Sequence, residues 1–226
     1  MLRLEDVKYK YGRISPYILN GVTYEFEKGT MYAVMGGSGA GKTTLMAVIA
    51  RLDKPSSGTI FYNGKDVETI NGDIYRAANV STIFQSYNLL QNYTAIDNIS
   101  TILSIIKYKG NYRERADELL REVGIPADKH KYVVQNLSGG EQQRVAIART
   151  IAANSEVILA DEPTGSLDAD NSENIMRIFM SLVQKYNKCV IIVTHSDDVA
   201  KYADHILKIA DGRITHDSTD APQPTM

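Results

Sequence analysis

The sequence predicts an α/β fold with a mixed sheet core, an N-terminal antiparallel β subdomain and a helical insertion subdomain. Short apolar runs typical of buried strands, such as "VILAD" (157–161) and "CVIIVT" (189–194), alternate with helical patterns, as in βαβ units of a parallel sheet. Residues 1–30 alternate in short stretches typical of antiparallel strands. The segment from about 88 to 135 is different, because its pattern is mainly helical.

The composition is that of a soluble globular protein that can bury a sizeable core. The chain has 226 residues, 43% of them hydrophobic, with a net charge of −2 and a pI of about 6.1. This balance argues against a dedicated nucleic-acid binder, which is usually basic. The single cysteine, Cys189, lies in an apolar run and is expected to be a buried core residue. No apolar run reaches the length of a membrane span, so we expect any spanning to be done by another polypeptide.

The N-terminal elements follow from short patterns. Turns are expected at Gly12, Gly21 and Gly29 between the strands of residues 1–30. "MYAVM" (Met31 to Met35) has the character of a buried strand, and it leads through a glycine-rich loop into the helix predicted for "TTLMAVIARL". "GTIFYNG" (58–64) predicts another strand closed by an Asn-Gly turn.

The later elements complete one domain over residues 1–216. "YRERADELLREVG" (112–124) is an amphipathic helix within the helical subdomain of about 88–135, ended by Gly124 and Pro126. "SENIMRIFMSLVQKYN" (172–187) carries apolar residues at helical spacing. The polar, proline-bearing residues 217–226 are expected to form a flexible tail.

A phosphate-binding loop occupies the turn between the first buried strand and its helix. The sequence "GGSGAGKT" fits G-x-x-x-x-G-K-[ST] in the strand–loop–helix context that this motif needs, so we predict a P-loop NTPase. Lys42 would reach the β- and γ-phosphates, and the Thr43 hydroxyl would bind Mg²⁺. The residues expected to contact ATP here are Gly36, Gly37, Ser38, Gly39, Ala40, Gly41, Lys42, Thr43 and Thr44.

Polar side chains follow three other predicted strands. Asp161 ends "VILAD", where it could hold Mg²⁺, and Glu162 follows it, where a carboxylate could take a proton from an attacking water. Gln85 and His195 follow "VSTIF" and "CVIIVT". Ligands bind at the carboxyl ends of strands in open α/β sheets, so Gln85 could position water or Mg²⁺ and His195 could contact the γ-phosphate. On spacing alone, each could instead be an ordinary surface residue.

A second anion-binding pattern is present in "NLSGGEQQRVAIART" (136–150). Ser138, Gly139 and Gly140 open what is predicted to be a helix, with Glu141 following them. Small residues expose backbone N–H groups at the positive end of a helix dipole. One chain therefore carries two potential phosphate cradles, which requires an explanation.

Together these motifs resemble the ATPase subunit of ABC transporters, over nearly the whole chain. "GGSGAGKTT" resembles the Walker A loop, "LSGGEQQR" the ABC signature, "VILADEP" Walker B and "SLD" (166–168) the D-loop. Gln85 and His195 match the Q-loop glutamine and the switch histidine. The family stacks an aromatic side chain near the N-terminus on adenine, a role that matches Tyr11, with Tyr9 as the alternative.

The resemblance implies an explanation for the two cradles. In this family two ATPase domains pair head to tail, and each Walker A site is completed by the signature motif of the other subunit. The implied cofactors are ATP and Mg²⁺, and the implied partners are a second copy of the chain and a membrane permease on a separate chain. "EPTGSLD" is similar to the macrolide-export, lipoprotein-release and bacitracin-export type, although the usual pattern there has Asn where this chain has Ser166.

The resemblance implies a permease-coupled ATPase at the cytoplasmic face of the cell membrane, and two other functions are alternatives to it. A nucleic-acid- or ribosome-associated ABC ATPase would carry two cassettes or a long coiled coil, and this chain carries one cassette with a short insertion. A P-loop kinase for a small molecule has no need of "LSGGEQQR". We therefore expect an ATP-hydrolysing transporter subunit that binds no nucleic acid, with the substrate left unspecified by this chain.

Overall fold

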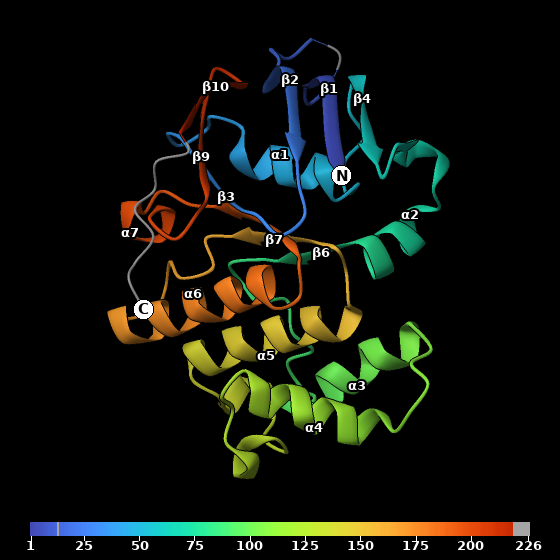
Figure 1. Ribbon diagram of the computed structural model, residues 1–226, viewed down its shortest axis with the longest axis vertical. Helices are drawn as coiled ribbons and strands as arrows, with labels where there is room; N and C mark the ends of the chain where they lie inside the picture. Colours follow the sequence, from blue (N-terminus) through green and yellow to red (C-terminus); the bar gives the residue numbers. More distant parts are fainter. Residues whose placement is uncertain (13, 219–226) are drawn as a thin grey trace.

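Two sheets form the structure, a computed structural model that describes residues 1–12 and 14–218 (Figure 1). The smaller sheet is antiparallel, with strand order β2-β1-β4-β5. Its strands are β1 (Leu2–Tyr9), β2 (Leu19–Phe26), β4 (Ser57–Tyr62) and β5 (Lys65–Asp66). The expected N-terminal β subdomain is therefore present, and β4 completes it from farther along the chain.

The larger sheet carries the strand ends that the sequence singled out. Its strand order is β10-β9-β3-β8-β7-β6, in which all neighbours are parallel except the antiparallel pair β9 and β10. The strands are β3 (Met31–Met35), β6 (Val80–Ile83), β7 (Val157–Asp161), β8 (Cys189–Val193), β9 (His205–Ala210) and β10 (Arg213–Ser218). This is the mixed sheet core that the sequence predicted.

The helices cover both faces of the larger sheet. Figure 1 shows α1 between the two sheets, α5 and α6 on the other face, and α3 and α4 beyond α5. The helices are α1 (Lys42–Ile49), α2 (Gly72–Ile74), α3 (Ala95–Ile105), α4 (Tyr112–Glu122), α5 (Gly139–Ala153), α6 (Ala169–Gln184) and α7 (Asp197–Ala200). Short 3-10 turns lie at Val67–Thr69, Ala127–Lys129 and Val134–Asn136, and a π-helical turn lies at Tyr75–Asn79.

Two hydrophobic clusters meet at the larger sheet because its central strands are buried on both faces. In β7, Val157 and Leu159 pack into the cluster that holds α1 and the antiparallel sheet, whereas Ile158 and Ala160 pack into the cluster that holds α3 to α6. Successive side chains of a strand point to opposite faces, so this alternation follows from β geometry. The larger sheet therefore separates α1 from α5, which becomes important for the two phosphate cradles.

Some expected details were wrong. Gly21 is not a turn but an extra residue inside β2, with φ +84°, where the pairing with β1 shifts at a β-bulge. The helical subdomain begins with an irregular stretch, since its first helix starts at Ala95. Strand β10 continues to Ser218, so the first two residues of the expected tail belong to a strand, and 219–226 lie outside the described residues.

Glu156 joins the two sheets just before β7. Its carboxylate accepts hydrogen bonds from Lys28, from the Tyr62 hydroxyl at 2.5 Å and from the Asn63 amide at 3.1 Å. Burial by itself raises the pKa of this carboxyl, but the hydrogen bonds from Lys28, Tyr62 and Asn63 outweigh burial and lower its pKa to about 2. A depressed pKa in the folded state means that the charged form stabilises the fold above the ordinary pKa of 4.5.

We expect Glu156→Gln to lower the melting temperature by about 2–4 °C at neutral pH, as the loss of about 1 kcal/mol would in a chain of this size. The difference from the wild type should shrink as pH falls from 4.5 toward 2, because the wild-type carboxylate is itself protonated there. Thermal melts over this pH range measure it, with Glu5→Gln, at an exposed carboxylate paired to Arg3, as the control. A difference that is constant with pH would contradict the assigned role.

Candidate nucleotide site

The phosphate loop links the end of β3 to the start of α1, as predicted. An added Cβ would lie 2.4 Å from the Ile209 carbonyl oxygen at Gly36 and 2.9 Å from the Ile18 carbonyl oxygen at Gly41, so packing against the backbone requires glycine at both positions. At Gly37 and Gly39 an added Cβ would meet nothing within 4 Å. These two glycines leave open space on the outer side of the loop, where a phosphate can approach the backbone.

Lys42 and Thr43 begin α1 at the mouth of this loop. The Lys42 ammonium donates to the carbonyl oxygens of Gly36 at 2.7 Å and Gly37 at 3.0 Å, so its charge lies across the cradle. The Thr43 hydroxyl lies 3.4 Å from an Asp161 carboxylate oxygen at the end of β7. Burial raises the pKa of Asp161, and its hydrogen bond with Thr43 opposes that effect. The structure thus brings together Lys42, Thr43 and Asp161 from separate parts of the chain.

The Glu162 carboxylate is held by two groups at the end of the neighbouring strand β8. The Thr194 hydroxyl donates to one of its oxygens at 3.1 Å, and His195 Nδ1 lies 2.7 Å from the other. The Glu162 backbone has φ +46°, a left-handed conformation that is uncommon for a residue with a side chain, and its N–H is bonded to the Val193 carbonyl. Strand β8 therefore fixes where this carboxylate points.

Gln85 lies near the same edge of the sheet, two residues after β6. A Cβ added to Gly165 would lie 3.7 Å from the Gln85 amide nitrogen, which places this side chain against the loop that follows Glu162. Gln85, Asp161, Glu162 and His195 thus follow the carboxyl ends of the adjacent parallel strands β6, β7 and β8. The parallel order of the strands explains why the sequence could predict this gathering.

The two tyrosines that are alternatives for stacking on adenine differ in their exposure. Tyr9 lies in β1 with 7% of its surface exposed, packed in the core, whereas Tyr11 is 57% exposed. The two rings meet edge to face with centroids 5.1 Å apart. Tyr11 also lines a pocket of about 270 Å³ together with Ile18 and residues 39–44 of the phosphate loop and α1. Of these two rings, that of Tyr11 is the exposed one and lines the pocket at the loop.

The second cradle forms the N-terminus of α5, as predicted. The Ser138 hydroxyl accepts a hydrogen bond from the Glu141 N–H at 3.3 Å, and the Glu141 carboxylate accepts one from the Ser138 N–H at 3.0 Å, which completes a capping box. The other Glu141 carboxylate oxygen pairs with Lys129 at 2.5 Å. Protein donors thus occupy both oxygens of Glu141, whose side chain was expected to face ATP.

The two glycines of this cradle differ in their surroundings. A Cβ at Gly140 would lie 2.7 Å from the Asn171 side-chain oxygen, so Gly140 is buried against α6. At Gly139 the nearest atom would be the Tyr87 hydroxyl at 3.2 Å. Gly139 is therefore the more open position at this helix end.

Sequence reasoning missed Thr194, Tyr87 and Asn171. Thr194 was taken as the last residue of a strand, although its hydroxyl holds the Glu162 carboxylate. Tyr87 bonds to Ser166 of the D-loop, and Asn171 bonds to Asp168 and Arg144. Their positions beside the recognised motifs were the only available signal, because their partners come from other parts of the chain.

The residues near Thr43 fit Mg²⁺. Hydroxyl, carboxylate and amide oxygens of Thr43, Asp161 and Gln85 are the hard ligands that this ion prefers, and Mg²⁺ is usually held by one or two carboxylates together with substrate phosphates. Within the part of the chain that the structure describes, no group of three or more His, Cys, Asp or Glu side chains could hold a metal by itself. A site that depends on the nucleotide phosphates is consistent with both observations.

The chain is similar in sequence to known ATP-binding proteins of transporters. Residues 19–165 match the family model described as "ABC transporter". The uncharacterized ABC transporter ATP-binding protein YclH of Bacillus subtilis is 40% identical, covering 95% of this chain and 96% of that protein. The lipoprotein-releasing system ATP-binding protein LolD of Bacteroides thetaiotaomicron is 36% identical, covering 96% of this chain and 100% of that protein.

A longer relative and a solved structure point to the same family. The macrolide export ATP-binding/permease protein MacB of Vibrio parahaemolyticus is 40% identical over 98% of this chain, which spans 34% of that protein. A solved structure described as the dimeric post-hydrolysis state of the ATP-binding cassette MJ0796 bound to ADP and Pi has a TM-score of 0.87 and 34% identity, covering 97% of this chain and 98% of that one. The chain therefore belongs to the ABC transporter family, as an ATP-hydrolysing, ATP-binding subunit.

Proposed function

We propose that two copies of this chain pair head to tail around two ATP molecules and drive a membrane permease on a separate chain. One observation carries the pairing: the larger sheet separates the phosphate loop and α1 from the signature helix α5. The pocket at the phosphate loop is lined by residues from 11 to 44 and includes none of α5. The second cradle is therefore free to serve the nucleotide of a partner, and the dimeric MJ0796 cassette supports this arrangement.

The first copy binds most of the nucleotide. Tyr11 stacks on adenine, and backbone N–H groups of the phosphate loop bind the phosphates. Lys42 moves its charge from the loop carbonyls to the β- and γ-phosphates. Thr43, Asp161 and Gln85 would hold Mg²⁺, which would neutralise phosphate charge.

The same copy activates the attacking water. The Glu162 carboxylate is the general base, and Thr194 and His195 orient it. Because His195 uses Nδ1 toward Glu162, its Nε2 remains available for the γ-phosphate. Gln85, at the end of the adjacent strand, positions the attacking water.

The partner closes the open side of the triphosphate. The Ser138 hydroxyl accepts from Glu141 and can still donate its own hydrogen, so it can bind a phosphate oxygen. The Gly139 N–H and the dipole of α5 add to this contact, with Gly140 held behind them against α6. The Glu141 carboxylate contributes by capping the helix rather than by touching ATP. The test is ATP-dependent pairing of the purified chain, measured by sedimentation with MgADP as the control.

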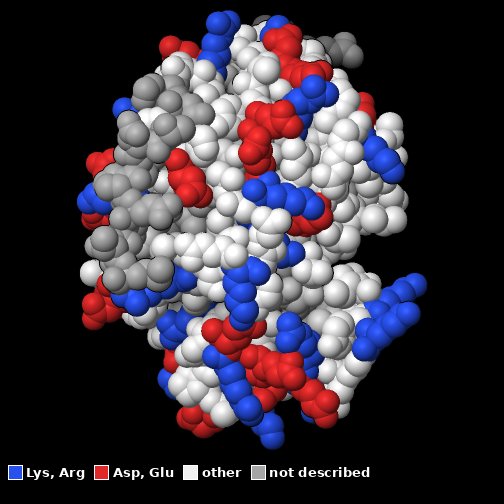
Figure 2. Space-filling view, viewed as in Figure 1, with Lys and Arg blue, Asp and Glu red and all other residues white. Residues whose placement is uncertain are grey.

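A permease partner is inferred from the names of the relatives and from an exposed apolar surface of this chain. Among the described residues no helix has the length and apolar character of a transmembrane span. A peripheral position at the cytoplasmic face of the membrane follows if the permease is separate. On the face shown in Figure 2, acidic and basic side chains are interspersed, without the continuous basic stripe that would follow a nucleic-acid backbone.

The docking face consists of Leu90, Tyr93 and Tyr132, which are 42%, 54% and 48% exposed. Backbone hydrogen bonds from Val134 to Tyr93 and from Ala95 to Tyr132 hold these segments side by side. Exposed apolar side chains gathered next to the Q-loop indicate a protein contact, and the proposed occupant is a cytoplasmic segment of the permease.

We expect Leu90→Glu to reduce co-sedimentation of the chain with permease-containing membranes about 10-fold or more, while ATPase activity of the purified chain survives. Leu89→Glu is the matched control, because Leu89 is buried and a charge there should unfold the chain. Membrane binding by Leu90→Glu equal to that of the wild type would show that the permease docks elsewhere.

A further inference from the structure

Tyr87 lies between three motifs that the proposed mechanism uses separately. It follows Gln85 by two residues, and its hydroxyl lies 3.0 Å from the Ser166 hydroxyl in the D-loop. The same hydroxyl lies 3.2 Å from the position that a Cβ at Gly139 would occupy. One side chain from the Q-loop therefore bonds to the D-loop and lies close to the open end of the signature helix.

The backbone around Tyr87 is held in an unusual conformation. Tyr87 and Asn88 have φ values of +61° and +47°, in the left-handed region that bulky residues rarely adopt. Arg149 of α5 donates to both of their carbonyl oxygens, at 3.2 Å to Tyr87 and 2.6 Å to Asn88. The planar guanidinium fork suits this double contact and ties the Q-loop to the signature helix.

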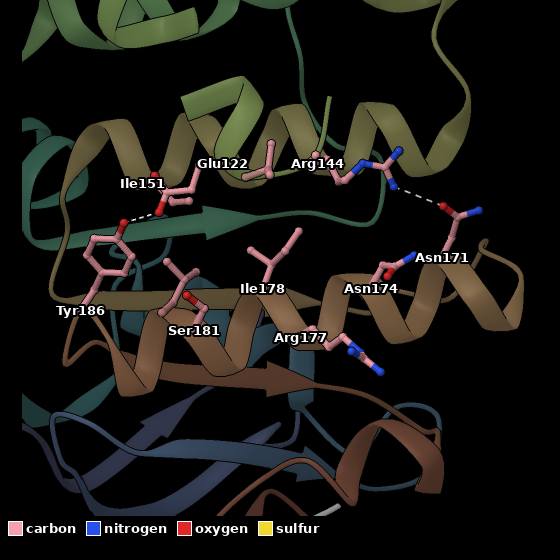
Figure 3. Close-up of a pocket in the computed structure, with 12 residues that line it drawn as sticks. Glu122, Arg144, Ile151, Asn171, Asn174, Arg177, Ile178, Ser181 and Tyr186 are labelled. Carbon is pink, nitrogen blue, oxygen red and sulfur yellow. Dashed lines mark hydrogen bonds between the residues drawn. The ribbon is translucent and has the colours of Figure 1, made fainter. Parts of the chain in front are cut away.

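The D-loop and the signature helix are also joined on their other side, where a cavity of about 560 Å³ separates α5 from α6. Figure 3 shows Arg144 from α5 and Asn171 from α6 pointing toward one another at one end of this cavity, with their atoms 3.2 Å apart. Asn171 also donates to the Asp168 carboxylate at 2.7 Å. The close approach of Gly140 to Asn171 leaves these two helix starts little room to move independently.

We propose that Tyr87 is a positioning residue that sets the D-loop and the signature cradle for pairing with the second copy. Its hydroxyl bond to Ser166, backed by the Arg149 clamp, holds both partner-facing segments in one arrangement. A displacement of the Q-loop would move the two segments together because Arg144 and Asn171 join them. This inference rests on the proposed pairing of two copies and adds the element that prepares each copy for it.

The test is a double-mutant cycle on ATP-driven pairing. Tyr87→Phe and Ser166→Ala each remove one hydroxyl from the pair, and both are made in a Glu162→Gln chain so that ATP is not consumed. Each should weaken the ATP-bound dimer about 2- to 10-fold, the usual worth of one hydrogen bond, in sedimentation experiments with MgATP. The double variant should be no weaker than either single variant, because the second change removes an interaction that is already lost.

Two controls separate positioning from general damage. Ser166→Thr keeps a hydroxyl and should pair like the parent. Tyr108→Phe removes a hydroxyl from an exposed ring that has no role in the proposed site or docking face, and it should also pair normally. Monomer affinity for MgATP should be unchanged in all variants, since the phosphate loop is untouched. A purely structural role would instead lower the melting temperature together with ATP affinity.

Failure of the inference and failure of the proposed function give different results. If two copies of the Glu162→Gln parent do not pair in the presence of MgATP, the proposed dimer is wrong, and the proposed role of Tyr87 is wrong as well. If the parent pairs and the single variants pair equally well, or if their effects multiply in the double variant, the positioning role of the Tyr87–Ser166 bond is overturned while the dimer stands.

Discussion

Glu162→Gln is expected to bind MgATP as tightly as the wild type but to hydrolyse it about 10²–10⁴-fold more slowly, the usual worth of a general base. The glutamine keeps the size of the side chain. Its oxygen can accept from the Thr194 hydroxyl and its amide NH2 can donate to His195 Nδ1, so the site should keep its shape. What disappears is the basic oxygen that takes the proton from water. The unreacted ATP should therefore accumulate in a stable dimer.

Steady-state ATPase assays and nucleotide titration measure these two effects separately. Glu173→Gln is the matched control, because Glu173 lines the same cavity of about 740 Å³ as Glu162 and His195 but is an exposed residue of α6. It should hydrolyse ATP at close to the wild-type rate. Near-normal turnover by Glu162→Gln would place the general base elsewhere.

Gly139→Asp is expected to leave the ATP affinity of the monomer intact and to abolish pairing and turnover. The new carboxylate would face the phosphates of the partner's ATP, and two like charges about 4 Å apart repel by about 4 kcal/mol at a protein surface. This repulsion corresponds to a loss of turnover on the order of 10³-fold. The monomer keeps its ATP affinity because the pocket at its own phosphate loop is lined by residues 11 to 44 and by none of α5.

Gly139→Ala tests whether the charge of the aspartate or the volume of an added side chain causes the loss of pairing. Its Cβ would lie 3.2 Å from the Tyr87 hydroxyl, so it needs only a small displacement of that side chain and adds no charge. We expect pairing to weaken far less than with Asp. Gly140 is unsuitable for this test, because a side chain there would collide with Asn171 and disturb α6. Loss of ATP affinity in the Gly139→Asp monomer would mean that the second cradle serves its own chain.

The sequence predicted best where local pattern and tertiary environment agree. The expected strands Met31–Met35 and Val157–Asp161 have the same bounds in the structure, because strands buried on both faces are continuous apolar runs. The signature helix starts after Ser138, as its capping residues predict. Residues at the carboxyl ends of parallel strands could be grouped in advance because the topology brings those ends together.

Contacts between distant segments could not be predicted. Whether Leu89 or Leu90 is exposed depends on how residues 85–94 pack on α3 and α5, and no periodicity applies to that irregular stretch. The glycine at 21 signals a positive φ in a turn and in a β-bulge alike. Ser166 was visible as a departure from the usual Asn, but its partner Tyr87 is 79 residues away in the sequence.

The mixed dimer tests the head-to-tail arrangement most directly. One chain carries Gly139→Asp, the other carries Lys42→Ala, both also carry Glu162→Gln, and two different tags allow only the mixed pair to be isolated after addition of MgATP. If the cradles act across the dimer, both lesions fall on one site and the other site is intact, so the mixed pair should form and retain ATP although neither variant pairs with itself. If each cradle serves its own chain, every site is damaged, and recovery of no mixed pair with bound ATP would contradict the arrangement.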